Sequence, residues 1–263
     1  MNKPLINYFK SDSLQLSIIC GRGVSKGFPM HRHLTVSIGM VLKGSRLLTI
    51  YKRKYIIAEN DVFVINSGEP HAIGSVCNPE HDYIVVSLSQ ALVHSYFPEG
   101  TQFNNIGECP ELANVLKNLF YALIRNESVT ETLKIEHFVP LLVNFQKDSI
   151  LQPTENTRFS IVKHLLDTSM NENFTLENLA AKAYLSTFHF ARLFKKITGL
   201  APHQYLLDNR LRAARQMLEK GQIVSDVAIE SGFYDTSHLV RHFTKYYGVS
   251  PLEFQKGTSK LLL

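Results

Sequence analysis

The sequence predicts a two-domain α+β protein, with an antiparallel β domain followed by an all-helical domain. Short β-rich runs broken by turn residues fill the chain up to about residue 90, as in a sandwich or barrel. From residue 110 onward, apolar residues recur with a helical period. A polar stretch around Pro153 separates the two parts and is typical of an interdomain linker. We therefore expect domains at residues 1–147 and 158–263, joined by a linker at 148–157.

Composition and charge narrow the class of protein. The chain has 263 residues, of which 44% are hydrophobic and 19% charged, so it is neither disordered nor fibrous. It contains no long apolar run and no secretory signal, which predicts a cytoplasmic protein with no membrane partner. Residues 151–263 carry 14 Lys and Arg against 10 Asp and Glu, and so +4 of the total net charge of +5. This excess hints at a polyanionic partner for the second domain.

The first domain is expected to contain six strands and then two amphipathic helices. The predicted strands lie at residues 14–21, 35–44, 46–51, 54–61, 62–71 and 82–89. The apolar stripe of the first helix, at 112–125, is formed by Leu112, Leu116, Leu119 and Leu123. The second helix, at 133–146, carries Leu141 and Phe145, and Pro140 lies near its first turn or kinks it. These stripes could form a homodimer interface, which we expect, or pack against the domain's own strands.

The second domain is expected to be entirely helical. Helical segments are predicted at 158–171, 175–183, 187–197, 203–219, 226–231, 236–246 and 251–256. Glycines mark the ends of helices at Gly199, Gly221 and Gly248. The expected N-caps are Thr175, Ser186, Ser225 and Asp235.

An internal repeat divides this helical domain into two equivalent units. The segment ARLFKKITGLAPHQY, at 191–205, aligns without gaps to VRHFTKYYGVSPLEF, at 240–254. The identical pairs are Arg192/Arg241, Phe194/Phe243, Lys196/Lys245, Gly199/Gly248 and Pro202/Pro251. A short helix and a tight turn precede each segment, and the second turn is longer by one residue, which the alignment places at Gly232. Each unit is therefore predicted to be a helix-turn-helix.

Helix geometry separates an inward and an outward face on the second helix of each unit. The inward residues are Phe190, Phe194 and Ile197 in the first unit, and Leu239, Phe243 and Tyr246 in the second. The outward residues are Phe188, Ala191, Arg192 and Lys195, and then Ser237, Val240, Arg241 and Thr244. Short side chains with one arginine suit a helix in the major groove of double-stranded DNA. A lone arginine on such a face would be interpreted as a solvated surface residue. Its recurrence at the same position in both units favours contact with DNA.

Residues 160–257 resemble the DNA-binding domain of the AraC/XylS family of bacterial transcription regulators. The resemblance rests on LAAKAYLSTFHFARLFKKITGLAPHQYL, RLRAARQMLEKG and VSDVAIESGFYDTSHLVRHFTKYYGVSPLEF. The second half matches the family signature at Ala228, Gly232, Phe233, Phe243, Gly248 and Pro251, with Thr244 in place of its lysine. The resemblance implies two helix-turn-helix units joined by a long helix.

The same resemblance implies which residues contact DNA. Base-contacting roles fall on Phe188, Ala191, Arg192, Thr236, Ser237 and Arg241. Phosphate contacts are expected from Lys195, Lys196 and Lys245, and His238 and Val240 complete the expected surface. Arg210, Arg212 and Arg215 lie on the connecting helix, where salt bridges within the domain are as good an interpretation as DNA contact.

The first domain carries two stretches, GFPMHRHLTVSIGMVLKG and DVFVINSGEPHAIG, that resemble the signature stretches of a cupin barrel, the usual effector-binding module of this family. The resemblance implies a cupin-like antiparallel β-barrel that binds a small-molecule effector. His31, His33 and His71 fall where a metal-binding cupin places three imidazoles. The carboxylate expected about four residues after the second histidine is absent, so we expect polar pocket or structural histidines and no required metal or cofactor. Met40 and Arg46 are expected to line the same effector site, with Arg46 pairing with a carboxylate or phosphate.

The function implied is a ligand-responsive, sequence-specific DNA-binding transcription regulator. We expect an activator that acts with RNA polymerase, and no enzymatic activity. The alternative is a metal-dependent cupin enzyme fused to a DNA-binding domain. No general base or nucleophile pair accompanies the three histidines, and the tandem helix-turn-helix units would then be unexplained.

Overall fold

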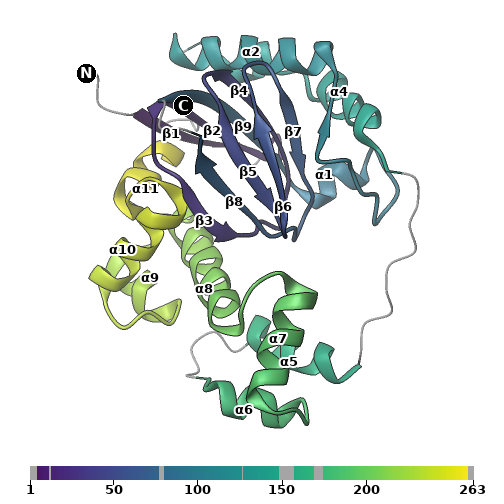
Figure 1. The fold of residues 1–263 in the computed structure, drawn as a ribbon. Helices are drawn as coiled ribbons and strands as arrows, with labels where there is room; N and C mark the ends of the chain where they lie inside the picture. Colours follow the sequence, from purple (N-terminus) through teal and green to yellow (C-terminus); the bar gives the residue numbers. More distant parts are fainter. Residues whose placement is uncertain are drawn as a thin grey trace. The chain divides into compact units, whose positions relative to one another are not determined.

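The computed structural model describes residues 5–11, 13–76, 80–125, 127–147, 157–168 and 174–259. The chain divides into two compact units, one built mainly from residues before 150 and the other mainly from residues 151–256 (Figure 1). Residues 148–156 of the expected linker lie outside the described residues. Within the described ranges, no helix combines the length and the apolar character needed to cross a membrane.

The strands form two β-sheets. The six-stranded sheet has the order β1-β2-β9-β4-β7-β10, and the four-stranded sheet has the order β3-β8-β5-β6. The strands are β1 (Leu5–Ser11), β2 (Leu16–Val24), β3 (Phe28–His31), β4 (Val36–Lys43), β5 (Arg46–Ile50), β6 (Arg53–Ile57), β7 (Val62–Ile65), β8 (His71–Ser75), β9 (His81–Leu88) and β10 (Ile106–Gly107). Neighbouring strands pair antiparallel. The antiparallel β fold is therefore confirmed, as two sheets rather than one closed barrel among the described strands.

Strand alternation gives the six-stranded sheet two buried faces. In β4, Met40 belongs to the core that also holds the leucines of α2 (Pro110–Ile124). The next residue, Val41, belongs instead to a second core, together with Leu48 of β5 and Phe63 of β7. Because successive side chains of a strand point to opposite faces, one face packs against α2 and the other is shared with the four-stranded sheet.

The leucine stripe of α2 packs inside its own unit. Leu112, Leu116 and Leu119 are fully buried and share one core with Ile38 of β4 and Ile84 of β9. Figure 1 shows α2 running along this sheet. The stripe therefore has no free surface to offer a second subunit, and the prediction that these leucines form a dimer interface is wrong. Periodicity identified a buried face correctly but did not identify what covers it.

The second predicted helix of this unit is divided into shorter pieces. The structure has α1 (Gln90–His94), α3 (Val129–Thr132), α4 (Ile135–Phe138) and a 3₁₀ helix, η1 (Val139–Phe145). Pro140 is in the first turn of η1, as expected for a residue that has no N–H to donate to an α-helix. Leu142 and Phe145 of η1 are fully buried in the same core as α2.

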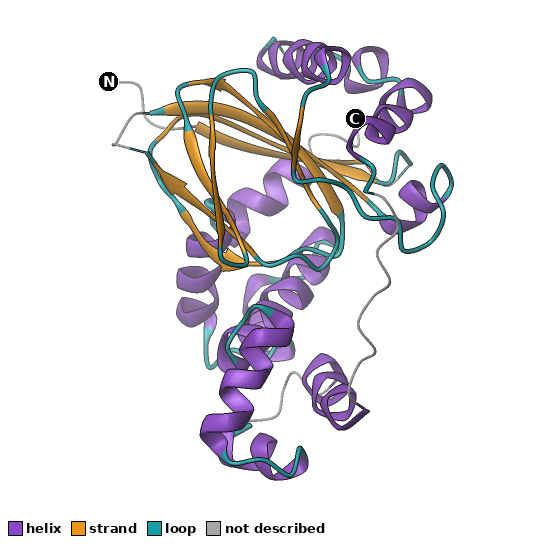
Figure 2. Ribbon diagram, turned by 45° about the vertical axis from the view of Figure 1, so that its right-hand side comes forward, coloured by secondary structure: helices purple, strands orange, loops and turns teal. Residues whose placement is uncertain are grey.

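Every described element from residue 157 onward is a helix (Figure 2). The helices are α5 (Thr157–Thr168), α6 (Leu176–Lys182), α7 (Thr187–Thr198), α8 (Pro202–Glu219), α9 (Val224–Glu230), α10 (Thr236–Tyr247) and α11 (Pro251–Ser259). Gly199 and Gly248 end α7 and α10 in the left-handed conformation. The side chains of Thr175, Ser186 and Asp235 accept N-cap hydrogen bonds as predicted. Ser225 does not, because α9 begins at Val224, two residues earlier than predicted, with Ile223 as its N-cap.

The two helix-turn-helix units, α6–α7 and α9–α10, are joined by the long helix α8. In the turns that precede α7 and α10, a backbone N–H donates to the carbonyl oxygen five residues earlier. The Leu185 N–H bonds to Ala180 at 3.0 Å, and the Phe233 N–H bonds to Ala228 at 2.8 Å. Tyr184 and Gly232 are therefore equivalent positions, and both have a positive φ, of 57° and 83°. The residue that lengthens the second turn is consequently Tyr234, and not Gly232 as the sequence alignment suggested.

The inward faces of α7 and α10 follow the prediction with one exception. Phe190 and Phe194 are fully buried, as are Leu239 and Phe243. Ile197 was expected among them but is 41% exposed. It lies in the last turn of α7, next to the helix end at Thr198, where the core of the unit does not cover it.

Candidate DNA interface and effector site

The outward face of α7 is cationic and carries one large aromatic side chain. Arg192, Lys195 and Lys196 are exposed, and Ala191 is half-buried. Phe188, in the first turn, is 77% exposed, so it is not a packing contact with the preceding helix. The Phe188 ring is therefore a solvent-facing apolar group among the cations of this face.

A hollow of about 370 Å³ lies along this side of α7. It is lined by Phe188, His189, Arg192, Leu193 and Lys196. Aromatic, cationic and imidazole groups thus border one concave surface, which can contact an anionic and partly apolar partner such as the edge of a DNA groove.

The outward face of α10 carries the equivalent cations on a more polar helix. Thr236, Ser237, Arg241 and Lys245 are exposed, and Val240 and Thr244 are half-buried. The turn before this helix exposes Tyr234 to 88%. Tyr234 is not among the site residues predicted from the sequence, although the extra residue in the second turn was the signal that could have identified it.

His238 and His242 interact with each other on the side of α10. Their rings are 4.7 Å apart, and the His238 ring also packs edge-on against Phe233 at 5.4 Å. Partial burial, helped by the positive charges of His238, Arg241 and Lys245, lowers the pKa of His242. His238, which was predicted to face DNA, is half-buried beside Phe233.

The arginines of the connecting helix α8 form salt bridges within the unit. Arg212 lies 3.3 Å from the buried carboxylate of Asp208, and Arg215 lies 3.0 Å from Glu219. Partial burial lowers the pKa of Arg210. For Arg212 and Arg215 the structure therefore shows the salt-bridge alternative.

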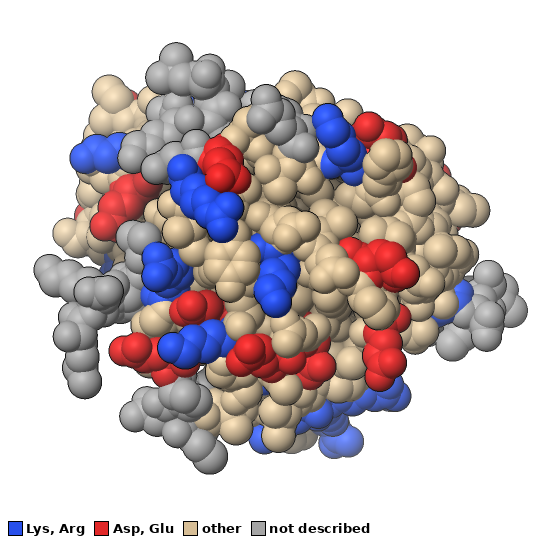
Figure 3. Space-filling model, turned by 90° about the horizontal axis from the view of Figure 1, so that it is seen from above, with Lys and Arg blue, Asp and Glu red and all other residues tan. Residues whose placement is uncertain are grey.

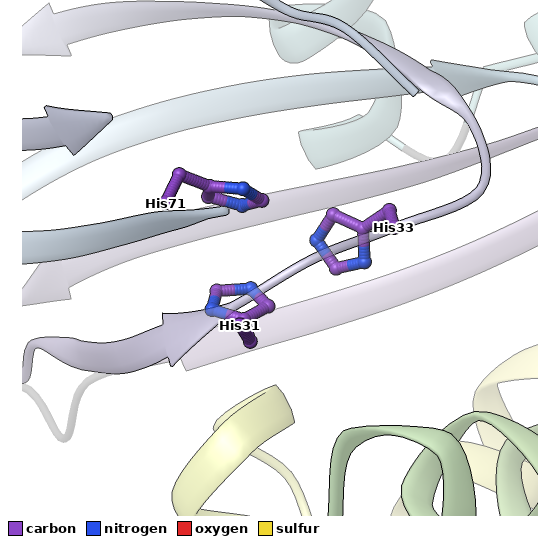
Figure 4. A group of neighbouring side chains, drawn as sticks. All are labelled: His31, His33 and His71. Atoms are coloured by element: carbon purple, nitrogen blue, oxygen red, sulfur yellow. The ribbon is translucent and has the colours of Figure 1, made fainter. Parts of the chain in front are cut away.

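The three N-terminal histidines do lie together. His31 ends β3, His71 begins the neighbouring strand β8, and His33 follows β3 by two residues. Figure 4 shows the three rings turned toward one another. One nitrogen of each ring lies within 4.8 Å of the corresponding nitrogens of the other two, and the ring centroids of His33 and His71 are 5.0 Å apart. Within the described residues they form the one group of His, Cys, Asp or Glu side chains arranged in this way.

The other two predicted effector residues lie away from the histidines. Met40 is fully buried in the six-stranded sheet, in the core that contacts α2, whereas β3 and β8, which carry His31 and His71, belong to the four-stranded sheet. Arg46 pairs with Ser75 at one end of β8, whereas His71 is at the other end, opposite Ile50. Four residues of strand separate the two positions, about 13 Å. The single effector site expected from the sequence is therefore not assembled from all five residues.

Arg46 lies in β5 of the four-stranded sheet and is buried against an aromatic ring. Its guanidinium carbon lies 4.0 Å from the centroid of the Tyr83 ring. Burial lowers the pKa of Arg46 to about 10 and raises the pKa of Tyr83. The Tyr83 ring also fills the space beside Gly21, where an added Cβ would be 2.3 Å from it. The Phe63 ring occupies the space at Gly39 in the same way.

The N-terminal unit does not present a continuous basic surface on the face shown in Figure 3. Acidic and basic side chains are interspersed there among uncharged ones. A polyanion is attracted by a surface of one sign of charge, and the visible residues of this face mix both signs. This agrees with the concentration of positive charge in residues 151–263.

Two protein-family models match the chain, and together they cover most of it. A helix-turn-helix domain matches residues 179–257, which contain α7 and α10, and an AraC-like ligand binding domain matches residues 15–142. The chain belongs to the AraC/XylS family. As a member, it is a ligand-responsive DNA-binding transcription regulator.

Relatives in this family are similar over most of their length. YbfI of Bacillus subtilis, an uncharacterized HTH-type transcriptional regulator, is 26% identical over 83% of both chains. The HTH-type transcriptional activator RhaS of Escherichia fergusonii is 25% identical over 88% of both chains. Among solved structures, ToxT from Vibrio cholerae has the same two-domain fold, with a TM-score of 0.55 over 95% of this chain and 99% of that one, at 12% identity.

Proposed function

We propose that α7 and α10 are two recognition helices that enter successive segments of the major groove of one DNA duplex. The observation that carries this proposal is the repeated placement of Arg192 and Arg241, which are exposed at equivalent positions of the two units. Two-unit readers of this type contact groove segments about one helical turn, or 34 Å, apart.

The proposed roles follow from side-chain chemistry. Arg192 and Arg241 would each contact a guanine through two hydrogen bonds, and Thr236 and Ser237 would contact base edges. Ala191 and Val240 are short, so they allow close approach to thymine methyl groups. Phe188 supplies a large apolar contact at the start of α7.

Phosphate contacts would set the register of the protein on DNA. Lys195, Lys196 and Lys245 are exposed next to the two arginines, and lysine binds phosphate as a point charge. These contacts add affinity without encoding sequence. His238, because it packs against Phe233, would contribute at the edge of this surface.

The N-terminal unit is proposed to bind a small-molecule effector and to pass that signal to the DNA-binding unit. His31, His33 and His71 are the proposed polar groups of that site. Arg46 and Met40 lie elsewhere in the fold, so neither supports the histidines in this role. The chemical identity of an effector is not implied by the structure of ToxT bound to an unsaturated fatty acid, because that likeness, at 13% identity, concerns the fold.

We propose that the protein acts as an activator together with RNA polymerase, since relatives such as RhaS and RhaR are named activators. A homodimer remains the proposed assembly, through a surface other than the buried leucines of α2. We expect the protein in the cytoplasm, where its proposed DNA partner lies. Family membership supports regulation rather than catalysis.

The experiment that tests the proposal is selection of bound fragments from random DNA. The proposal predicts enriched sequences with two short conserved blocks whose centres are about one helical turn apart, 10 to 10.5 base pairs. The proposal is contradicted if no sequence is enriched. It is also contradicted if only one block is enriched and that block is still enriched after Arg192 or Arg241 is replaced.

A further inference from the structure

The turn between α9 and α10 carries one residue that the turn between α6 and α7 lacks. In the first unit, the N-cap residue Ser186 directly follows Leu185. In the second unit, Tyr234 stands between Phe233 and the N-cap residue Asp235. Because the first unit closes its turn without such a residue, the helix-turn-helix fold does not require Tyr234. We infer that Tyr234 contacts the DNA backbone, and that its hydroxyl donates a hydrogen bond to a phosphate oxygen.

Tyr234 has no packing role among the residues that the structure describes. Its side chain is 88% exposed. Within the described part of the chain, its ring contacts no other ring or cation and its hydroxyl has no hydrogen-bond partner. A tyrosine that stabilises a fold is normally buried, with its hydroxyl bonded. The ring and the hydroxyl of Tyr234 are therefore both available to a partner.

The backbone on either side of Tyr234 is fixed. Phe233 is only 4% exposed, and its N–H bonds to the carbonyl oxygen of Ala228 at 2.8 Å. On the other side, the Asp235 carboxylate accepts the N-cap hydrogen bond from the backbone N–H of His238 at 2.6 Å. A backbone that is already ordered lowers the entropic cost of holding a side chain against a partner. Tyr234 is thus presented from a defined position at the start of α10.

The proposed base contacts of the second unit begin at this end of α10, and the inference rests on that proposed function. Thr236 and Ser237 are exposed in the first turn, and Arg241 follows further along the helix. The acidic neighbour Asp235 is directed toward the helix backbone by its cap, where the helix dipole favours a negative charge. Tyrosine hydroxyls are among the groups that donate to phosphate oxygens in protein–DNA complexes. A phosphate is therefore the partner that suits Tyr234.

A phosphate contact made by a tyrosine differs measurably from one made by a lysine. The hydroxyl is uncharged near neutral pH, so it neutralises no phosphate and releases no counterion. Loss of the contact should therefore lower the affinity for DNA without changing the slope of log K against log salt concentration. Base preference should also stay the same, because a phosphate carries no sequence information.

The test is Tyr234→Phe in the full-length protein, which removes only the hydroxyl from an exposed side chain. Binding is measured by fluorescence anisotropy, at several salt concentrations, with a DNA site selected by the wild-type protein. We expect the affinity to fall by about 3- to 10-fold at every salt concentration, with an unchanged slope. Tyr121→Phe, at an exposed position of α2, is the control and should bind as the wild type does. Both variants should keep the wild-type melting temperature.

Replacing single phosphates of the selected site with uncharged methylphosphonates locates the contact. At one phosphate, the replacement should weaken the wild-type protein more than it weakens Tyr234→Phe. We expect that phosphate to flank the base block that requires Arg241, and not the block that requires Arg192.

The inference is overturned if Tyr234→Phe binds as tightly as the wild type while Arg241→Ala weakens binding. A changed base preference in Tyr234→Phe would also overturn it, because the hydroxyl would then contact a base. If Arg241→Ala has no effect either, the proposed function of α10 fails, and this inference fails with it.

Discussion

Arg192 and Arg241 occupy the same position on the second helix of their respective helix-turn-helix units, and both are exposed. The two positions are equivalent in the structure as well as in the sequence alignment. The helices α7 and α10 have the same length, and both end in left-handed glycines, Gly199 and Gly248. An exposed arginine in a unit that is repeated within one chain, beside exposed lysines, forms two matching cationic surfaces. We base the proposed reading of DNA on this pair.

Replacing Lys245 with Ala should weaken binding to all DNA sequences alike. A phosphate contact releases about one counterion, so the slope of log K against log salt concentration should fall by about 1. Fluorescence anisotropy with a selected site and a scrambled site, each at several salt concentrations, measures both effects. Lys117→Ala, at an exposed position of α2, should leave the slope unchanged. A change in base preference without a change in slope would show that Lys245 contacts bases.

Asn66→Ala should destabilise the N-terminal unit. The Asn66 side chain accepts a hydrogen bond from the backbone N–H of Phe103 at 2.7 Å and donates one to the Phe103 carbonyl at 2.9 Å. Because buried polar groups without partners cost about 1–3 kcal/mol each, we expect the free energy of unfolding to fall by about 2–4 kcal/mol. Chemical denaturation measures this change. Asn114→Ala on the exposed side of α2 should shift the midpoint very little, and equal shifts in the two variants would refute the account.

Tyr184→Gly and Gly232→Ala should have opposite effects on stability. Both positions have a positive φ, of 57° and 83°, a conformation that glycine adopts without strain. The first change should be neutral or stabilise by up to about 1 kcal/mol, and the second should destabilise by about 1 kcal/mol or more. Thermal or denaturant unfolding of the two variants tests this directly. If Gly232→Ala proves neutral, the equivalence of the two turns is wrong.

Acidification should destabilise the C-terminal unit in part through His242. Partial burial and neighbouring positive charges lower the pKa of His242 in the folded chain. The unfolded chain therefore binds the proton more readily, and stability is lost as pH falls through the unfolded-state pKa of about 6.5. Denaturation at pH 7.5 and at pH 5.5 should show a smaller loss for His242→Gln than for the wild type. An equal loss in both proteins would exclude His242 as a contributor.

Sequence patterns predicted the features that depend on neighbouring residues. Phe194 and Phe243 are buried as their helical period required, and Thr175, Ser186 and Asp235 cap helices as their side chains allow. The features that failed depend on contacts that are distant in sequence. The period of α2 showed that Leu116 is buried but not what covers it, and alternation in β4 could not tell which face Met40 joins. The extra residue of the second turn was wrongly placed at Gly232, because backbone hydrogen bonding, and not residue identity, makes Gly232 equivalent to Tyr184.

The central claim is that the two arginine-bearing helices read adjacent groove segments, and the most direct measurement compares base preference in two variants. Selection from random DNA is repeated with Arg192→Ala and with Arg241→Ala. We predict that each variant loses preference at one guanine, that the two positions lie about one helical turn apart, and that each change costs about 1–3 kcal/mol at the wild-type site. If both variants keep the wild-type base preferences and affinity at moderate salt, these helices do not read the DNA.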